Sequence, residues 1–187
     1  SQIEAWVRVG NNELLQIKKS LDLGIDGIII PMIKSEEEAK NAVKFSRYPP
    51  IGIRSYGYCK ANKYGINFNQ YLRKNKNLKV ILQIEHVKAI ENLEKILSVK
   101  NIDGTFIGPY DLSGSMGKPG DYNDEDVQLV LKKYINIAKK YDKLIGIHVI
   151  EPNMVEVNKR FNEGYDFIAL SSDILFFSSS IKKQFIK

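Results

Sequence analysis

The chain contains few of the residues that form disulfide bonds or zinc sites. Among its 187 residues there is one cysteine, Cys59, and there are two histidines, His86 and His148. A single cysteine excludes an intrachain disulfide and any zinc site built from several cysteines. Because nothing near Cys59 in the sequence would activate its thiol, we interpret it as an incidental loop residue.

The chain also lacks an apolar run long enough to cross a membrane. Its longest apolar stretches, residues 27–33 and 78–84, fall far short of the roughly 20 residues that span a bilayer, and neither lies at the N-terminus. We therefore expect no membrane span and no signal peptide, and the cytoplasm is the default location. A hydrophobic content of 43% with 27% charged residues predicts one soluble domain with a sizeable core.

Positive charge exceeds negative charge, but the excess is not clustered. The net charge is +6 and the sequence pI is near 9.2, and residues 54–64 mix basic and aromatic side chains as nucleic-acid-binding surfaces do. The lysines are nevertheless spread over every predicted helix, which is typical of solvated helix faces. We therefore expect no nucleic-acid partner.

Strand-like and helix-like patterns alternate along the chain. Apolar runs predict strands over residues 3–9, 27–31, 78–85, 104–107, 144–148 and 167–170. Helices are predicted over residues 12–23, 67–74, 87–97, 124–140 and 152–162, with a further helix opened by Ser35 and a terminal helix from about residue 172. Ser35 and Glu38 have the spacing of a capping box, and residues 108–120 are predicted to be a glycine-rich loop.

Fully apolar strands that alternate with amphipathic helices indicate a parallel sheet covered by helices. Such an α/β sheet is either open and doubly wound or closed into a barrel. A (β/α)8 TIM barrel takes about 250 residues. Six strand–helix units in 187 residues leave space for two more units. We therefore expect residues 1–187 to form a single TIM-barrel domain that is N-terminally incomplete, with about six β/α units present.

Two carboxylates follow neighbouring strands of this predicted sheet. Glu85 ends the strand of residues 78–85, and Asp111 comes shortly after the strand of residues 104–107. Adjacent parallel strands lie about 4.8 Å apart, so side chains that leave their carboxyl ends can reach one cation. A lone acid is more often a helix cap or a solvated loop charge. The two together predict a metal site.

Ordered motifs along the chain resemble those of the metal-dependent pyruvate aldolases of the HpcH/HpaI family. The resemblance spans essentially the whole chain, and a run of motifs in order is more specific than any single one. The motifs are VRV at 7–9, LDLG at 21–24, IIIPMI at 28–33, YPPIGIRS at 48–55, QIE at 83–85 and IDGTFIGPYDLSGSMGKPG at 102–120.

This resemblance implies a barrel enzyme that cleaves or forms a carbon–carbon bond in a 4-hydroxy-2-oxo acid, giving pyruvate or a close 2-oxo acid and an aldehyde. Glu85 and Asp111 match the family's metal-binding carboxylates, and oxygen ligands suit Mg²⁺, Mn²⁺ or Co²⁺. Arg8 matches the arginine that stabilises the developing enolate, and Gln83 matches a glutamine of the pyruvate site. The backbone N–H groups of Tyr110 and Asp111 match those that hold the substrate carboxylate. The alternatives are a rim salt bridge for Arg8, a strand-tying hydrogen bond for Gln83 and a simple tight turn at Tyr110.

The resemblance leaves the proton-transfer group open. The family uses a histidine, with an aspartate close by, in a strand–helix unit that precedes the start of this chain. Asp22 matches a family acid that orients this histidine, across a subunit contact in one interpretation, and a surface acid at a helix end is the alternative. Neither histidine of this chain matches the family base. We expect His86 to begin a helix, and His148 to be a packed residue, a metal neighbour or a substitute base.

Other residues are weaker candidates. Glu151 and Asp173 follow strand ends, although Asp173 after Ser172 also resembles a helix start. Arg54 and Tyr56 are expected in a loop at the barrel mouth, where they would touch the aldehyde half of the substrate or only pack the loop.

Three interpretations of function remain open at this point. The first is the aldolase, and the second is a non-catalytic relative that binds a metal and a 2-oxo acid. The third is a related lyase that acts on an acyl thioester, which would need a nucleotide-binding groove. The resemblance implies a small-molecule 2-oxo-acid substrate and a homo-oligomer with exchanged C-terminal helices, to which the apolar residues 174–177 are suited.

Overall fold

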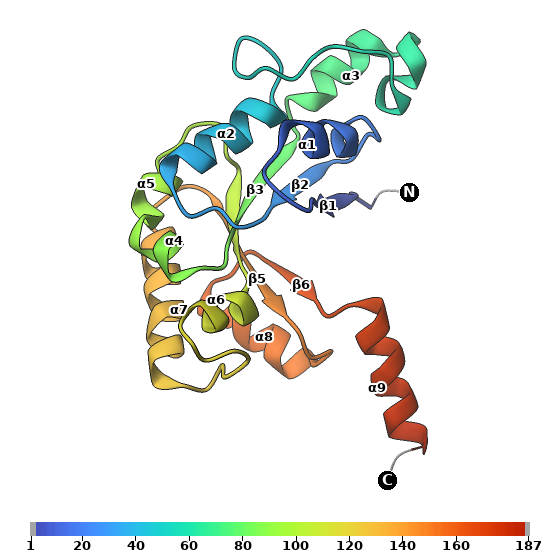
Figure 1. Ribbon diagram of the computed structural model, residues 1–187. Coiled ribbons are helices and arrows are strands. Elements are labelled where there is room, and N and C mark those ends of the chain that lie inside the picture. Colours follow the sequence, from blue (N-terminus) through green and yellow to red (C-terminus); the bar gives the residue numbers. More distant parts are fainter. Residues whose placement is uncertain (1–2, 186–187) are drawn as a thin grey trace.

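Six parallel strands form a single sheet in the computed structural model, which describes residues 3–185. The strands are β1 (Trp6–Arg8), β2 (Gly27–Ile30), β3 (Lys79–Ile84), β4 (Gly104–Ile107), β5 (Leu144–Val149) and β6 (Phe167–Leu170). They are hydrogen-bonded in sequence order, and every neighbouring pair is parallel. The sheet curls as part of a TIM barrel, with helices on its outer side (Figure 1). The predicted fold class is confirmed, with six β/α units.

Helices connect the strands. They are α1 (Leu14–Leu21), α2 (Glu36–Ser46), the 3-10 helix η1 (Lys60–Gly65), α3 (Phe68–Asn75), α4 (Val87–Glu91), α5 (Leu93–Leu97), α6 (Pro109–Ser115), α7 (Glu125–Ala138), α8 (Met154–Glu163) and α9 (Asp173–Phe185). The predicted capping box is present at α2, where the Ser35 hydroxyl accepts from the Glu38 N–H and the Glu38 carboxylate accepts from the Ser35 N–H. Gly24 follows α1 with φ of +91°, a conformation that favours glycine.

Two stretches differ from the sequence prediction. Residues 87–97 form two short helices instead of one, because Asn92 leaves the helical conformation and its amide donates to the Lys34 carbonyl at 3.0 Å. Residues 108–120 are not all loop, since α6 begins directly after Gly108. Proline at the first position of α6 and Asp111 in its first turn both favour a helix start. The sequence analysis predicted a loop instead, because residues 108–120 are rich in glycine.

The main core lies between the sheet and the helices that cover its outer face. Its members are apolar side chains that alternate along the strands and face outward, together with the inner faces of α1, α2, α5 and α7. They include Ile28, Ile30, Val80, Leu82, Ile84, Ile107, Ile145, Ile147, Leu21, Ala39, Leu93 and Leu131. This burial fixes which side of each strand faces the opposite, concave side of the sheet.

Aromatic rings occupy the concave side. The Trp6 ring lies 5.4 Å from the Phe167 ring between centroids, and the Phe106 ring lies 5.8 Å from the Phe167 ring. Glycines make room for these rings, because a Cβ at Gly27 would lie 2.6 Å from Trp6 and a Cβ at Gly146 would lie 2.2 Å from Phe167. The rings therefore fill the barrel interior below the carboxyl ends of the strands.

The last helix, α9, extends away from the rest of the molecule (Figure 1). It exposes Ile174, Phe176, Phe177 and Phe185. Within residues 3–185, no helix combines the length and the apolar character that crossing a membrane requires.

Candidate active site

The candidate site lies at the carboxyl ends of the strands. Arg8 is the last residue of β1, Glu85 directly follows β3, and Gly108 directly follows β4. In a TIM barrel this edge carries the catalytic groups, because the strand ends and the loops after them converge there. Asp111 reaches the same edge from the first turn of α6.

Arg8, Gln83 and Glu85 form one hydrogen-bonded group. The Arg8 Nε–H donates to Gln83 Oε1 at 2.8 Å, and Gln83 Nε2 donates to Glu85 Oε2 at 2.5 Å. Arg8 Nη2 lies 3.9 Å from Glu85 Oε1. Gln83 and Glu85 are buried, at 5% and 1% exposure, whereas half of the Arg8 side chain is exposed. The exposed guanidinium can therefore contact a ligand while its Nε remains fixed.

Asp111, in the first turn of α6, lies near enough to Glu85 to affect its pKa. Burial raises the pKa of Glu85, and the charge and hydrogen-bonding proximity of Asp111 raise it further, against the opposing effects of the Met32 N–H and Arg8. The site therefore disfavours two negative charges unless a cation lies beside them. That these two acids hold one cation stays a prediction.

Met32 supplies a contact that the sequence analysis did not identify. Its backbone N–H donates to Glu85 Oε1 at 2.8 Å. Met32 has φ of +59°, an uncommon conformation for a residue with a side chain, and such strain is frequent at functional sites. Because position 32 is neither glycine nor asparagine, the sequence did not indicate this left-handed backbone conformation.

Gly108 permits the close packing of this group. A Cβ at Gly108 would lie 3.0 Å from Gln83 Nε2, 3.0 Å from Glu85 Oε2 and 3.2 Å from Glu85 Cβ. Its φ of −100° is open to any residue, so the requirement for glycine is one of space.

We expect Gly108→Ala to lower the activity that the family resemblance implies by about 10- to 100-fold, since the added methyl group would displace the Gln83 amide that orients Glu85. The measurement is kcat/KM for the substrate class that the resemblance implies, with the circular dichroism spectrum unchanged. Gly114→Ala is the matched control within α6, because its Cβ would have its nearest neighbour, Pro119 Cβ, at 4.0 Å. Equal activity of the two variants would contradict the steric argument.

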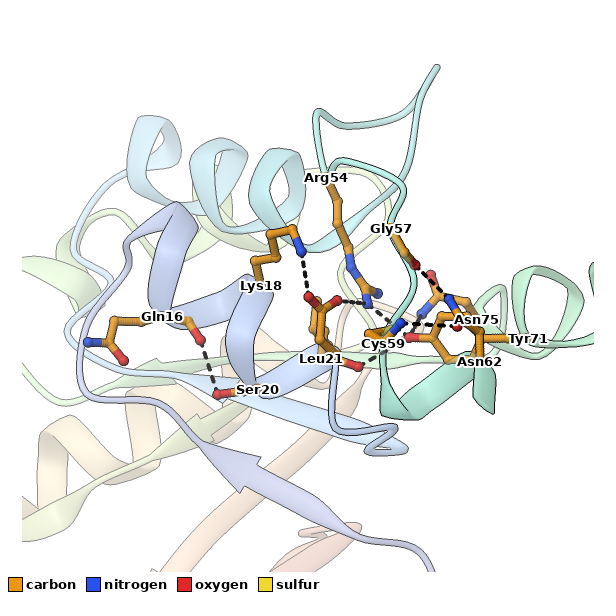
Figure 2. A network of polar contacts seen from close by, with 11 residues as sticks. Gln16, Lys18, Ser20, Leu21, Arg54, Gly57, Cys59, Asn62, Tyr71 and Asn75 are labelled. Carbon is orange, nitrogen blue, oxygen red and sulfur yellow. Dashed lines mark hydrogen bonds and ion pairs between the residues drawn. The ribbon is translucent and has the colours of Figure 1, made fainter. Parts of the chain in front are cut away.

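Asp22 lies at the opposite edge of the sheet. It follows α1 and precedes β2, so it belongs with the amino-terminal ends of the strands. Its carboxylate pairs with Lys18 and, at 2.8 Å, with Arg54 Nη2. Figure 2 shows Lys18 and Arg54 converging from α1 and from the segment after α2. Within one copy of the chain, Asp22 therefore does not join the group around Glu85.

The expected position of Arg54 and Tyr56 at the barrel mouth is wrong. Their segment follows a helix and precedes a strand, so it lies at the amino-terminal edge. Arg54 is fully buried, with its guanidinium 4.5 Å from the Tyr48 ring centroid and donating to the Tyr71 hydroxyl at 3.0 Å. Burial alone would lower the pKa of Arg54, but Tyr71, Asp22 and Tyr48 raise it overall. The role of Arg54 is therefore structural.

The remaining candidates have different positions and partners in the structure. His86 caps α4, because its Nδ1 accepts from the Lys88 N–H at 3.1 Å, as predicted. The Ser172 hydroxyl accepts from the Leu175 N–H at 3.4 Å, so Ser172 and Asp173 form a helix start. His148 is half-buried in β5 at the carboxyl edge.

A cavity of about 310 Å³ lies beside this edge, between the segment that precedes α7 and the beginning of α8. Its lining includes Pro109, Tyr122, His148 and Glu151 and does not include Glu85. The Tyr110 ring, which is exposed, lies 6.3 Å from the Tyr122 ring. Neither Glu85 nor Asp111 lines the cavity, which lies on the β5 side.

The family model described as HpcH/HpaI aldolase/citrate lyase matches residues 1–179. The chain belongs to the HpcH/HpaI aldolase/citrate lyase family. It is 34% identical over 178 residues to the 5-keto-4-deoxy-D-glucarate aldolase of Escherichia coli O6:H1, a match that covers 95% of this chain and 69% of the relative.

Solved structures agree with this membership. An HpcH/HpaI aldolase/citrate lyase family protein from Burkholderia cenocepacia J2315 superimposes with a TM-score of 0.89 at 27% identity, over 96% of this chain and 71% of that one. The citrate synthase SbnG superimposes with a TM-score of 0.79, also at 27% identity, over 97% and 71% of the two chains. As a member of the HpcH/HpaI family, the protein is a carbon–carbon lyase of the aldolase type.

Membership of the HpcH/HpaI family raises the question of whether the site can hold a divalent metal. No cluster of three or more His, Cys, Asp or Glu residues suited to a metal is present among the described residues. Two carboxylates are nevertheless sufficient for an ion such as Mg²⁺, which commonly keeps several waters and takes further oxygen ligands from its substrate. The raised pKa of Glu85, to which burial and the neighbouring Asp111 both contribute, fits such an ion, because a cation would stabilise the charged carboxylate.

Proposed function

We propose that the protein cleaves or forms the C3–C4 bond of a 4-hydroxy-2-oxo acid, with pyruvate or a close 2-oxo acid and an aldehyde as products. The supporting observation is the meeting of Glu85 and Asp111 beside a half-exposed Arg8 that Gln83 holds in place. The relative named 5-keto-4-deoxy-D-glucarate aldolase supports a substrate of this class.

Glu85 and Asp111 would hold one divalent ion, Mg²⁺, Mn²⁺ or Co²⁺. When bound, such an ion supplies Lewis-acid polarisation of the substrate carbonyl. The acyl-thioester alternative has no specific observation in its favour.

Arg8 stabilises the enolate that develops when the C3–C4 bond breaks. Its guanidinium is permanently charged, and the bond from its Nε to Gln83 leaves the outer nitrogens available to a substrate oxygen. Preorganised charge of this kind lowers the barrier, because nothing has to reorient as the negative charge forms. The backbone N–H groups of Tyr110 and Asp111, in the first turn of α6, bind the substrate carboxylate.

The proposed assembly is a homo-oligomer in the cytoplasm. The apolar side chains that α9 exposes would be covered by another copy of the chain. A catalytic role of Asp22 also requires a second copy, because within one copy Asp22 lies at the edge of the sheet opposite to Glu85.

The test is release of pyruvate from 5-keto-4-deoxy-D-glucarate in the presence of Mg²⁺, followed by coupling to lactate dehydrogenase. We expect turnover that EDTA abolishes and that added Mg²⁺ or Mn²⁺ restores. Binding of metal and pyruvate without turnover of any 4-hydroxy-2-oxo acid would favour the non-catalytic relative and overturn the proposal.

A further inference from the structure

Another cavity lies at the amino-terminal edge of the sheet, opposite to the edge that carries Glu85. It measures about 550 Å³ and lies between the end of α2, the end of α3 and the segment that precedes β4. Ligand pockets in proteins typically measure about 300–1,000 Å³. None of the residues that the proposed function uses lines this cavity. It is therefore separate from the candidate active site.

Arg47 brings a positive charge to this cavity. It follows α2 directly, and its side chain is 11% exposed. Its Nη2 donates to Asp103 Oδ2 at 2.9 Å and to the Asn101 carbonyl at 3.1 Å. Its Nη1 makes no hydrogen bond with a described residue and is not enclosed by the protein. The guanidinium is therefore fixed through one nitrogen and open to a ligand through another.

The charges that line the cavity do not cancel. Arg47 and Lys76 are positive, and Asp103 is the one acid among the described residues of the lining. The Asp103 carboxylate also accepts from the Val80 N–H at 2.8 Å and lies 3.8 Å from Lys79 Nζ. Burial lowers the pKa of Arg47 even with Asp103 beside it, and a second anion would stabilise the charged guanidinium. The lining therefore favours an anion of single charge.

The rest of the lining is largely apolar and includes a fixed aromatic pair. The Tyr48 and Tyr56 rings stack with 4.7 Å between centroids and 2° between their planes. Because Tyr56 covers one face of Tyr48, the Arg54 guanidinium, 4.5 Å from the Tyr48 centroid, lies over the other face. Tyr56 is 51% exposed and offers its ring to a ligand. The apolar members of the lining are Tyr48, Pro49, Pro50, Ile51, Tyr56 and Leu72.

We propose that this cavity binds an organic monocarboxylate with an aromatic or aliphatic body. The carboxylate pairs with Arg47 Nη1, the exposed Lys76 adds positive potential, and the apolar body packs against Tyr48 and Tyr56. Hydrogen bonds between a guanidinium and a carboxylate are charge-assisted and stronger than neutral ones. The proposal goes beyond the proposed function and is independent of it, since the ligand needs neither a 2-oxo group nor a metal.

Titration calorimetry with 3-phenylpropanoate tests this proposal. The matched ligand is 3-phenylpropanamide, which has the same apolar body without the charge. We expect the carboxylate to bind at least about tenfold more tightly than the amide. If the wild type bound no 3-phenylpropanoate, or bound both ligands equally, the proposal would be overturned. A contact between copies of the chain that covered the cavity would give the first of these results.

Two variants at exposed positions test the lining without removing a buried group. We expect Lys76→Met to weaken 3-phenylpropanoate binding by about two- to fivefold, and Tyr56→Ala to weaken it by about two- to tenfold. Lys44→Met and Tyr58→Ala are the matched controls, because Lys44 and Tyr58 are exposed and lie outside the lining. We expect the controls to bind as the wild type does. Equal losses in the variants and their controls would contradict the assigned lining.

Competition with pyruvate separates this cavity from the active site. Pyruvate with Mg²⁺ should not displace 3-phenylpropanoate, and Glu85→Gln should leave its affinity unchanged, because Glu85 lies at the other edge of the sheet. Displacement by pyruvate would place the probe at the active site and overturn the proposal. A protein that binds 3-phenylpropanoate in this way but cleaves no 4-hydroxy-2-oxo acid would overturn the proposed function alone.

Discussion

Replacing Glu85 by glutamine is expected to lower kcat/KM for aldol cleavage by about 10²- to 10³-fold and to weaken Mn²⁺ binding by at least about tenfold. Glutamine has the same shape but no charge, and its one amide oxygen can accept from only one of the two donors, on Met32 and Gln83, that now meet separate carboxylate oxygens. The unsatisfied donor opposes the relief of repulsion from Asp111, so we expect the free energy of unfolding to change little.

Steady-state kinetics, calorimetric titration with Mn²⁺ and thermal unfolding measure these three effects. Glu91→Gln is the matched control, because Glu91 is an exposed acid on α4 close to Glu85 in the sequence. We expect Glu91→Gln to behave as the wild type. A Glu85→Gln protein that keeps both its activity and its Mn²⁺ affinity would remove the basis of the proposed site.

Replacing Asp22 by asparagine is expected to destabilise the fold strongly. The change leaves the Arg54 guanidinium fully buried without its counter-ion, and Arg54 Nε and Nη1 have no hydrogen-bond partner among the described residues. Removing one partner of a buried ion pair typically costs about 3–5 kcal/mol. Because the Asp22 side chain is 24% exposed, we expect a loss of free energy of unfolding near the lower end of that range.

Urea denaturation measures this loss. The double variant Asp22→Asn, Arg54→Met should recover part of it, since no buried charge then lacks a partner. Glu36→Gln breaks the exposed pair of Glu36 with Lys40 and is expected to leave the free energy of unfolding nearly unchanged. If Asp22→Asn unfolded at the same urea concentration as Glu36→Gln, the pair of Asp22 with Arg54 would not contribute to stability. A catalytic role of Asp22 would appear separately, as a fall in kcat of the folded protein.

Local chemistry explains why the strands and most of the helices could be predicted. The strand of residues 104–107 and the capping box at Ser35 were predicted where the structure has them, because apolar runs and cap spacing act over a few residues. The break at Asn92 could not be predicted, since it depends on a carbonyl from a distant segment, that of Lys34.

The candidate site was predictable only in part. Glu85 and Asp111 follow strand ends, and strand ends of a parallel sheet share one edge, so the sequence indicated that the two acids meet. The Met32 N–H and the left-handed backbone at Met32 carried no sequence signal. The position of Arg54 was predicted wrongly, because composition does not tell at which edge of a barrel a loop lies.

By itself, the sequence determined the alternating β/α pattern, the parallel sheet, the family and the carboxylates at the strand ends, because each follows from periodicity or from motifs within a short span. Only the tertiary structure decided the contacts between distant segments: the missing Cβ of Gly108 against Glu85, and the burial of Arg54 against Asp22. These depend on register and packing between distant segments, which the order of residues along the chain does not display.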